Sequence, residues 1–142
     1  MDQEGVVKAL SIREPYLDYI IRCGKRIENR SWATSYRGEL VLHASLRVEH
    51  AGIVAGYHDE ARRYMKTLGM IRGQCRITDC LRPREALRCF PSQACWIYAG
   101  EDSWCWVLEN VEPFPCPQPA KGRLGLWEVD DELVEMARGH LS

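Results

Sequence analysis

The residues of this sequence that are best suited to chemistry are crowded into one short stretch, Lys25 to Trp32. Alternate side chains of an extended chain share a face. One face of this stretch would therefore carry two cations, a carboxylate and an indole ring: Arg26, Glu28, Arg30 and Trp32. Two interpretations are open. The stretch is either a solvated edge strand whose charges prevent wrong pairing, or a cleft wall that holds fixed charges beside an aromatic surface.

The elements before this stretch can be read from periodicity. Apolar residues alternate from Val6 to Ile12 and predict a strand, which Pro15 ends because the residue before a proline avoids the helical region. Proline also suits a first helical turn, and the apolar residues after it recur at intervals of three and four residues, as on one face of a helix. Gly24 stands where a left-handed helix cap is needed. We therefore predict a helix from Pro15 to Gly24.

The middle of the chain predicts alternating strands and helices. Period-two alternation, helical spacing and turn signals predict these segments: a strand over 39–44, a helix over 48–68, a strand over 71–81, a short helix over 83–87 and a loop over 91–94. His43 is the histidine that this pattern places on a strand. A structural histidine satisfied by a neighbour and a ligand-binding or proton-transfer group are both open for it.

The last third of the chain predicts a central strand. Residues 104–111 are apolar on both faces, as in a strand with neighbours on both sides. Its two tryptophans could stack bases, but large aromatic residues at this period more often belong to a core. Proline at every second position from Pro113 to Pro119 predicts an extended, solvated connector. A strand over 124–129 and a helix capped by Asp130 complete the chain.

Composition limits the classes of protein and of partner. The 142 residues suit one domain, and the net charge of -1 argues against strong non-specific attachment to nucleic acid or to an anionic membrane. Any nucleic-acid contact must then come from a local basic patch. No apolar run approaches the ~18 residues that span a bilayer, and nothing resembles a signal peptide. We expect a single domain over residues 1–142, a monomer, located in the cytoplasm, or in the nucleus if its source is eukaryotic.

The cysteines argue for a reducing compartment. Their number is seven, which is odd, and their spacing shows no pairing. A zinc site is the alternative, but no C-x-x-C occurs and the spacing of Cys75, Cys80, Cys89 and Cys95 does not match the usual ligand pattern. We therefore expect free thiols, with no metal and no cofactor.

Five separated blocks of the chain resemble the ASCH domain family (activating signal cointegrator homology), whose fold is similar to the PUA barrel of RNA-modifying proteins. The blocks are LSIREPY (10–16), GKRIENRSW (24–32), YRGEL (36–40), ITDC (77–80) and a closing segment with Lys121-Gly122 and LGLW (124–127). They follow the family's order over nearly the whole chain and are closest to the coactivator-type branch. One departure is visible: Cys23 stands where the family usually has glycine, so the turn into Lys25 need not match.

The resemblance implies an α+β domain in which five or six strands curl into a small PUA-like barrel, with helices from Pro15 and from Val48 outside it. It also implies that the strand with Glu28 and Arg30 meets the Lys121-Gly122 segment at a cleft near the first helix. The expected ligand-binding residues, with Arg13 and His43 at the rim, are Arg13, Lys25, Glu28, Arg30, Trp32, His43, Lys121 and Gly122.

Such a set suits a nucleotide or a short RNA strand, because cations bind phosphate, an indole stacks on a base, and a carboxylate accepts from a base amino group. The resemblance therefore implies an RNA- or nucleotide-binding domain that acts in transcription coactivation, RNA metabolism or translation. A protein-interaction module is an alternative of another class.

A small hydrolase is the other alternative. Some members of the family hydrolyse acetylated cytidine with a lysine and a threonine, and others are described as ribonucleases. Lys25 occupies the lysine position, but Glu28 stands at the threonine position. An enzyme of this kind would need Lys25 or Glu28 to activate water and Lys121 to stabilise the developing anion.

Overall fold

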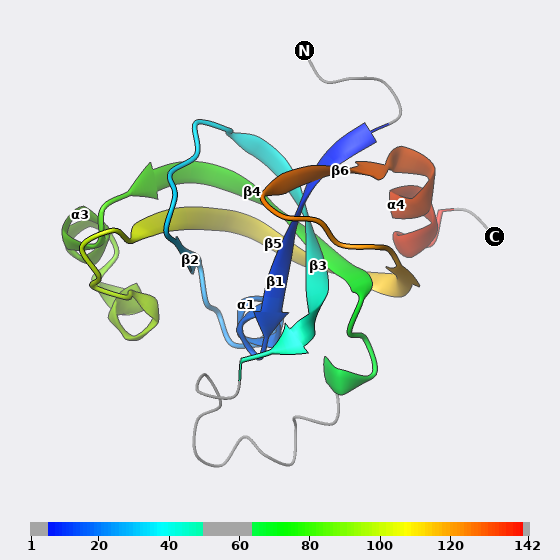
Figure 1. Ribbon diagram of the computed structural model, residues 1–142, viewed down its shortest axis with the longest axis horizontal. Coiled ribbons are helices and arrows are strands. Elements are labelled where there is room, and N and C mark those ends of the chain that lie inside the picture. The colour runs from blue at the N-terminus through cyan, green and yellow to red at the C-terminus, as the bar shows by residue number, and fades with distance from the viewer. Residues whose placement is uncertain (1–5, 50–63, 141–142) are drawn as a thin grey trace.

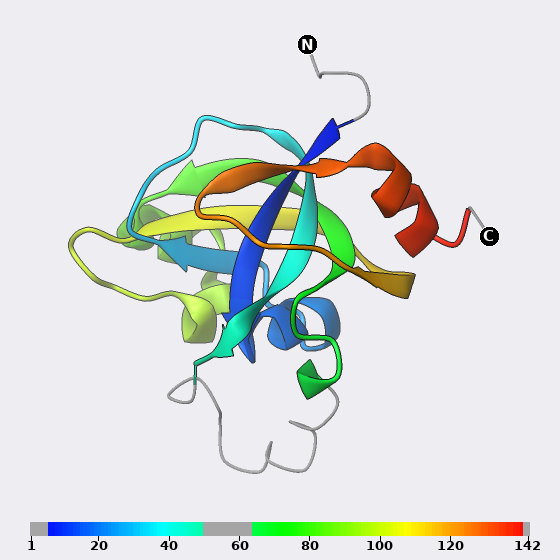
Figure 2. The same cartoon turned by 45° about the vertical axis from the view of Figure 1, so that its right-hand side comes forward.

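The computed structural model describes residues 6–49 and 64–140. Within them, one mixed sheet is formed by six strands: β1 (Val6–Glu14), β2 (Ile27–Arg30), β3 (Gly38–Val48), β4 (Met70–Leu81), β5 (Trp104–Pro119) and β6 (Leu126–Asp130). The order across the sheet is β2-β5-β4-β3-β1-β6, and β1 and β3 run parallel while the other neighbours run antiparallel. Figures 1 and 2 both show this sheet strongly curved.

The α+β fold predicted from the sequence is confirmed, but the sheet is not a closed barrel. In the part of the chain that the structure describes, β2 and β6 are the two edges and do not pair with each other. The curvature nevertheless gives the sheet a concave face, which holds the main hydrophobic core. Strand count and period could not decide closure, because closure depends on the register between segments far apart in sequence.

Short helices lie around the sheet. The structure describes α1 (Tyr16–Arg22), α3 (Pro83–Cys89), the 3-10 helix η3 (Pro91–Trp96) and α4 (Asp131–Ala137). The predicted caps are present: Gly24, just after α1, has a φ of 77°, and the Asp130 carboxylate accepts a hydrogen bond from the Glu132 N–H. Figure 1 places α3 and α4 at opposite ends of the sheet.

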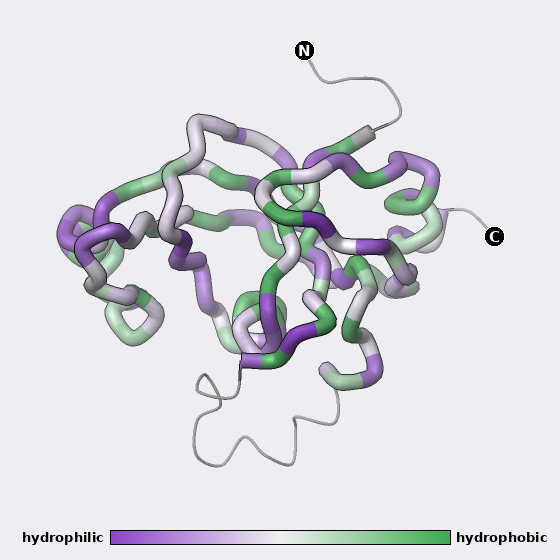
Figure 3. The backbone as a smooth tube through the Cα atoms, viewed as in Figure 1, coloured by the Kyte–Doolittle hydropathy of each residue, from purple (hydrophilic) through white to green (hydrophobic). Residues whose placement is uncertain are grey.

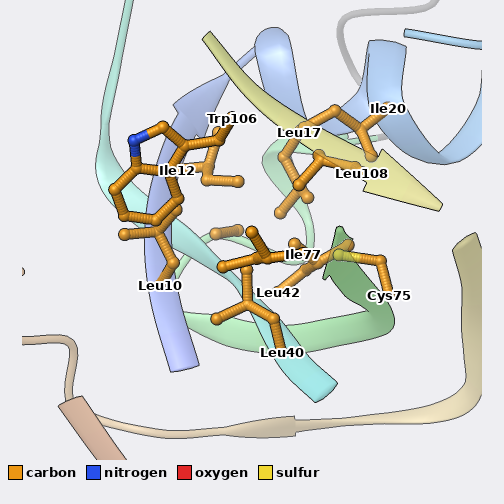
Figure 4. Packing of buried hydrophobic residues seen from close by; sticks show 11 residues of the cluster. Leu10, Ile12, Leu17, Ile20, Leu40, Leu42, Cys75, Ile77, Trp106 and Leu108 are labelled. Atoms are coloured by element: carbon orange, nitrogen blue, oxygen red, sulfur yellow. The ribbon is translucent and has the colours of Figure 1, made fainter. Parts of the chain in front are cut away.

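Trp106 of β5 is fully buried in the concave core. Figure 4 shows it among aliphatic side chains from β1, β3, β4, β5 and α1: Leu10, Ile12, Leu17, Ile20, Leu40, Leu42, Ile77 and Leu108. The alternation predicted for β3 is confirmed, since Leu40, Leu42 and Ala44 enter this cluster while Val41 packs in a second cluster on the other face. Of the two tryptophans expected in the core, Trp106 is buried there, and Trp104 is partly buried and packs against the same cluster.

A buried ion cluster joins β1, α1 and β4. Glu14, at the end of β1, accepts a hydrogen bond from the Asp18 N–H at 2.7 Å and so satisfies a donor in the first turn of α1. Its other oxygen contacts the Arg72 guanidinium at 2.7 Å, and Arg72 also lies 3.5 Å from Asp18. Both carboxylates are fully buried. Neither oxygen of the Asp18 carboxylate has a hydrogen-bond partner among the described residues.

The prediction that Pro113–Pro119 is a connector was wrong, although the segment is extended and mostly exposed as expected. This segment is the second half of β5 and pairs with β4, with Pro113 opposite Gly73 and Pro119 opposite Met70. Alternate residues of a strand direct their N–H groups to opposite edges. Prolines at every second position therefore remove donors from one edge only. The edge facing β4 keeps its N–H groups, and β2 pairs with β5 only over residues 104–107.

Two further segments differ from expectation. The strand predicted over 39–44 extends to Val48, so the helix predicted from Val48 cannot start there. Most of that predicted helix lies outside the described residues. The loop predicted over 91–94 is part of η3. Glu14 accounts for the longer β3, because its carbonyl accepts a hydrogen bond from the Glu49 N–H and keeps the two parallel strands together to their ends.

Candidate functional site

A cleft of about 1330 Å³ opens between β1, β2, the end of β3 and the segment 119–125 that leads into β6. Most of the residues expected at the site line this cleft: Arg13, Glu28, Arg30, Trp32, His43, Lys121 and Gly122. Lys25 is not on the lining and is only 2% exposed, behind Glu28. Among the described residues, the structure thus brings together side chains from segments more than a hundred residues apart.

Glu28 lies between two cations at the wall of the cleft. One oxygen of its carboxylate accepts a hydrogen bond from Lys25 Nζ at 3.1 Å, and the other lies 2.9 Å from the Arg30 guanidinium. Burial raises the pKa of Glu28, but the charges of Lys25 and Arg30 outweigh burial, and the pKa is lowered overall. Glu28 is therefore ionised at neutral pH. The interpretation of β2 as a solvated edge strand was wrong at this residue, which is 6% exposed.

Arg30 and Trp32 form the next part of the same wall. The Arg30 guanidinium donates to the Ser11 carbonyl at 2.9 Å, so β1 and Glu28 together fix its position. The Trp32 ring meets Trp106 edge-on, with ring centroids 4.7 Å apart, and its backbone carbonyl accepts from Trp106 Nε1. The core thus holds the Trp32 ring in one orientation beside Arg30.

His43 connects the sheet to the closing segment. Its Nε2 lies 2.7 Å from the Ala120 carbonyl, and its Nδ1 lies 2.9 Å from Ser11 Oγ. Burial lowers the pKa of His43, so the ring is neutral at pH 7. A carbonyl can only accept, so Nε2 carries the proton and Nδ1 accepts from the Ser11 hydroxyl. Trp127 Nε1 donates to the same hydroxyl oxygen at 3.1 Å.

Gly122 fits closely over this hydrogen-bonded group. A Cβ at this position would lie 2.7 Å from both His43 Cε1 and Ser11 Oγ. Glycine is therefore required here, because there is no room for a Cβ atom. The closing segment approaches the sheet through Gly122, which leaves Lys121 and Arg123 on either side of it exposed at the cleft.

The lining of the cleft is basic. Its described residues include five cations, Arg13, Arg30, Arg47, Lys121 and Arg123, and two carboxylates, Glu28 and Glu49. Arg13 lies 3.5 Å from Glu49, and Glu28 is neutralised as described above. Arg47, Lys121 and Arg123 form no ion pair with any residue that the structure describes. The cleft can therefore attract and hold an anion.

Among the residues of the cleft lining, Ser11, Arg47 and Arg123 were not expected at the site. Arg123 could have been found, because it stands only two residues after Lys121 in the same short segment. Arg47 could not, because the predicted strand ended at Ala44 and left Arg47 outside it, whereas β3 continues to Val48. Arg26 was expected on the face of Glu28, but its guanidinium donates to the Ile20 carbonyl at 2.8 Å, and Arg26 is absent from the described lining.

Comparison with known proteins agrees with this fold. The family model described as "ASCH domain" matches residues 10–118, and the chain belongs to this family. The matched range ends before Lys121, so the closing segment lies outside it. Activating signal cointegrator 1 from Homo sapiens is 23% identical and that from Mus musculus 24%, each over 91% of this chain. The chain spans 23% of the length of these curated relatives.

Solved structures show the same fold. The crystal structure of ASCH from Zymomonas mobilis covers 90% of this chain and 90% of its own, with a TM-score of 0.56 and 9% sequence identity. A mutant form of the Zymomonas mobilis protein covers 91% of this chain and 94% of its own, with a TM-score of 0.55 and 9% identity. Separately, no helix within the described ranges is long and apolar enough to cross a membrane.

Proposed function

We propose that this ASCH domain binds single-stranded RNA, or a nucleotide of it, in the cleft. The observation that carries the proposal is the excess of cations on the described lining of a chain whose net charge is -1. A basic patch on a mildly acidic protein binds phosphates locally rather than along the whole surface. The association of the ASCH family with RNA binding supports the same ligand.

The residues would divide the work according to their contacts. Lys121 and Arg123 are exposed and contact phosphate oxygens, while Trp32 offers its half-buried ring to a base. Glu28 does not read a base in this proposal, because both of its oxygens are held by cations. It instead orders Arg30 at the wall. The cleft is larger than the roughly 300–1,000 Å³ of most small-molecule pockets, which favours several nucleotides over one.

The test is to replace both exposed cations of the closing segment, as Lys121→Gln with Arg123→Gln. Neither side chain pairs with a described residue, so the fold should be kept. We expect the affinity for a short single-stranded RNA, measured by fluorescence anisotropy, to fall roughly tenfold. The slope of log K against log salt should become shallower by about 1.4, since each phosphate on a single strand contributes about 0.7.

The matched control removes two cations elsewhere, as Lys8→Gln with Arg76→Gln. Lys8 and Arg76 lie outside the cleft lining, and Lys8 has only an exposed contact of 3.4 Å with Glu128. This variant should bind RNA as the wild type does. Equal affinity of the closing-segment variant and the wild type would contradict the proposal, as would equal losses in both variants.

The hydrolase alternative has less support. A general base must take up a proton near neutral pH, but the pKa of Glu28 is lowered and both of its oxygens accept from cations. Lys25 is buried and donates to Glu28 and to the Ile27 carbonyl. We expect binding without turnover when wild type is offered acetylated cytidine or RNA. Hydrolysis by wild type that is lost in Glu28→Gln would favour the enzyme.

The biological setting follows from the relatives only as a proposal. Activating signal cointegrator 1 carries a coactivator's name, and its similarity to this chain supports a role in transcription coactivation. RNA metabolism, translation and a protein-interaction role are the other settings consistent with a small binding domain. A cytoplasmic or nuclear location stays a prediction.

A further inference from the structure

We infer that the RNA path continues out of the cleft, across the start of β5, to a second phosphate contact on α3, so that the ligand is an extended strand rather than a nucleotide. The inference rests on the proposed function of the cleft. Its first support is the register of β2 and β5, in which Arg30 lies directly opposite Trp104. Opposite residues of antiparallel strands face the same side, with Cβ atoms about 5 Å apart. Trp104 is therefore the neighbour of a cleft-lining cation.

The Trp104 ring carries a fixed cation of its own. The Arg82 guanidinium lies 3.9 Å from the ring centroid and donates to the carbonyls of Glu101 and Ser103 at 3.2 Å. These contacts hold a flat guanidinium against a flat indole. Cations alternating with aromatic rings, as in the series Trp32, Arg30, Trp104 and Arg82, are typical of surfaces that bind single strands.

Helix α3 follows Arg82 and adds two more cations. Its Ala86 packs on the face of β5 that carries Cys105 and Val107, opposite to Trp104, so the RNA path turns around the start of β5 to reach these cations. Arg84 and Arg88 are four residues apart and share a face of the helix. With Arg82 and Glu85 they surround a shallow hollow of about 410 Å³, so that three arginines and one glutamate gather at this place on the surface. Arg84 and Arg88 are exposed and form no ion pair with the described part of the chain. Figure 3 shows hydrophilic residues along both β2 and α3.

Phosphate is the chemistry that the three exposed arginines around this hollow fit, because guanidinium groups bind phosphate with two parallel hydrogen bonds. The acidic side chains of Glu101 and Asp102 are exposed in the turn beside α3. They confine the basic surface to the helix face and to Trp104. An RNA strand leaving the cleft past Arg30 would place a base on the Trp104–Arg82 pair and its flanking phosphates on α3.

The test compares two RNA lengths and removes only the α3 cations, as Arg84→Gln with Arg88→Gln. One RNA has about three nucleotides, enough for the cleft, and the other about ten. For wild type we expect the longer RNA to bind at least tenfold more tightly. The α3 variant should bind the short RNA as wild type does but lose most of the gain with length. Its salt slope for the longer RNA should become shallower by about 1.4.

The Lys8→Gln, Arg76→Gln protein is again the charge-matched control and should keep the full gain. Three results would overturn the inference and leave the cleft function standing. The short RNA could bind wild type with no gain in affinity for the longer RNA, the gain could survive in the α3 variant, or the control could lose the gain equally. Both the inference and the cleft function fall if wild type binds neither RNA. Tighter binding of polyglutamate than of RNA, lost in the α3 variant, would overturn the inference in favour of an acidic protein partner.

Discussion

Buried polar residues set the geometry of the cleft. Lys25 shows why part of this was beyond prediction. Strand alternation places Lys25 and Glu28 on opposite faces, but β2 begins only at Ile27, and the Lys25 side chain bends back to the Ile27 carbonyl and to Glu28. Residue types in the block 25–32 correctly indicated a charged wall, whereas the ion pair inside it depends on a turn whose path the sequence does not reveal.

Gly122→Ala should disturb the cleft through space alone, because its Cβ would collide with His43 and Ser11. We expect a loss of stability of about 1–3 kcal/mol and a shifted His43 ring signal by NMR. Wild-type His43 should titrate with a midpoint below 6.5, since burial lowers its pKa.

Gly125→Ala is the matched control for this change. Gly125 has a φ of 70° but nothing within 4 Å of an added Cβ, so only the backbone is strained. It should cost about 1–2 kcal/mol and leave the His43 signal unchanged. Unchanged His43 signals in Gly122→Ala would show that the closing segment is not packed as described.

Secondary-structure elements were predicted well where one local pattern decided them. The strands with alternating apolar residues and the caps at Gly24 and Asp130 depend on neighbours in sequence, and all are present. The segment 113–119 was misassigned because the cost of a proline in a strand depends on whether its N–H faces a partner. That is a property of the sheet and not of the segment.

The junction of β1, α1 and β4 should make stability depend on pH. Burial raises the pKa of Glu14 to about 7, and Arg72 offsets only part of this effect. The unfolded chain loses the proton near 4.5, so between 4.5 and 7 the unfolded state binds fewer protons, and stability falls as pH rises. Glu14→Gln should remove this decline, which amounts to about 3 kcal/mol.

Urea unfolding of both proteins at several pH values from 4.5 to 7.5 checks this prediction. His43 contributes in the opposite direction, because its lowered pKa favours the folded state as pH rises, but it is present in both proteins and cancels in their difference. Glu109→Gln, at an exposed position of β5, is the control and should follow wild type. If the free energy of unfolding changes with pH in the same way in wild type and in Glu14→Gln, the raised pKa of Glu14 is contradicted.

At the scale of the whole molecule, the order of the strands joins residues from both ends of the chain. β1 lies between β3 and β6, so the cleft is completed only when the last strand pairs with the first. Local periodicity carries no information on this order. The family resemblance supplied the approach of residues 121–122 to β2, and the incomplete closure of the sheet appeared only in the structure.

The cysteines provide a test of the packed molecule. None of the seven forms a disulfide; Cys75 and Cys105 are buried, and burial raises the pKa of Cys75 to about 12. In the native protein a thiol reagent should therefore modify the exposed cysteines quickly: Cys23, Cys89, Cys95 and Cys116. Cys75 and Cys105 should react only after unfolding, when all seven thiols are titrated without reductant. A lower total would reveal a disulfide or a bound metal.

The prolines of β5 also affect how this protein behaves at high concentration. An open sheet presents unpaired N–H and C=O groups that can recruit a strand from another molecule and start aggregation. Beyond residue 107, β5 extends past the end of β2, and its outer edge there has prolines at 113, 115, 117 and 119. An incoming strand would find acceptors but few donors along this edge. The prolines that led to the wrong assignment of this strand therefore also hinder pairing between the β5 edges of two copies of the protein.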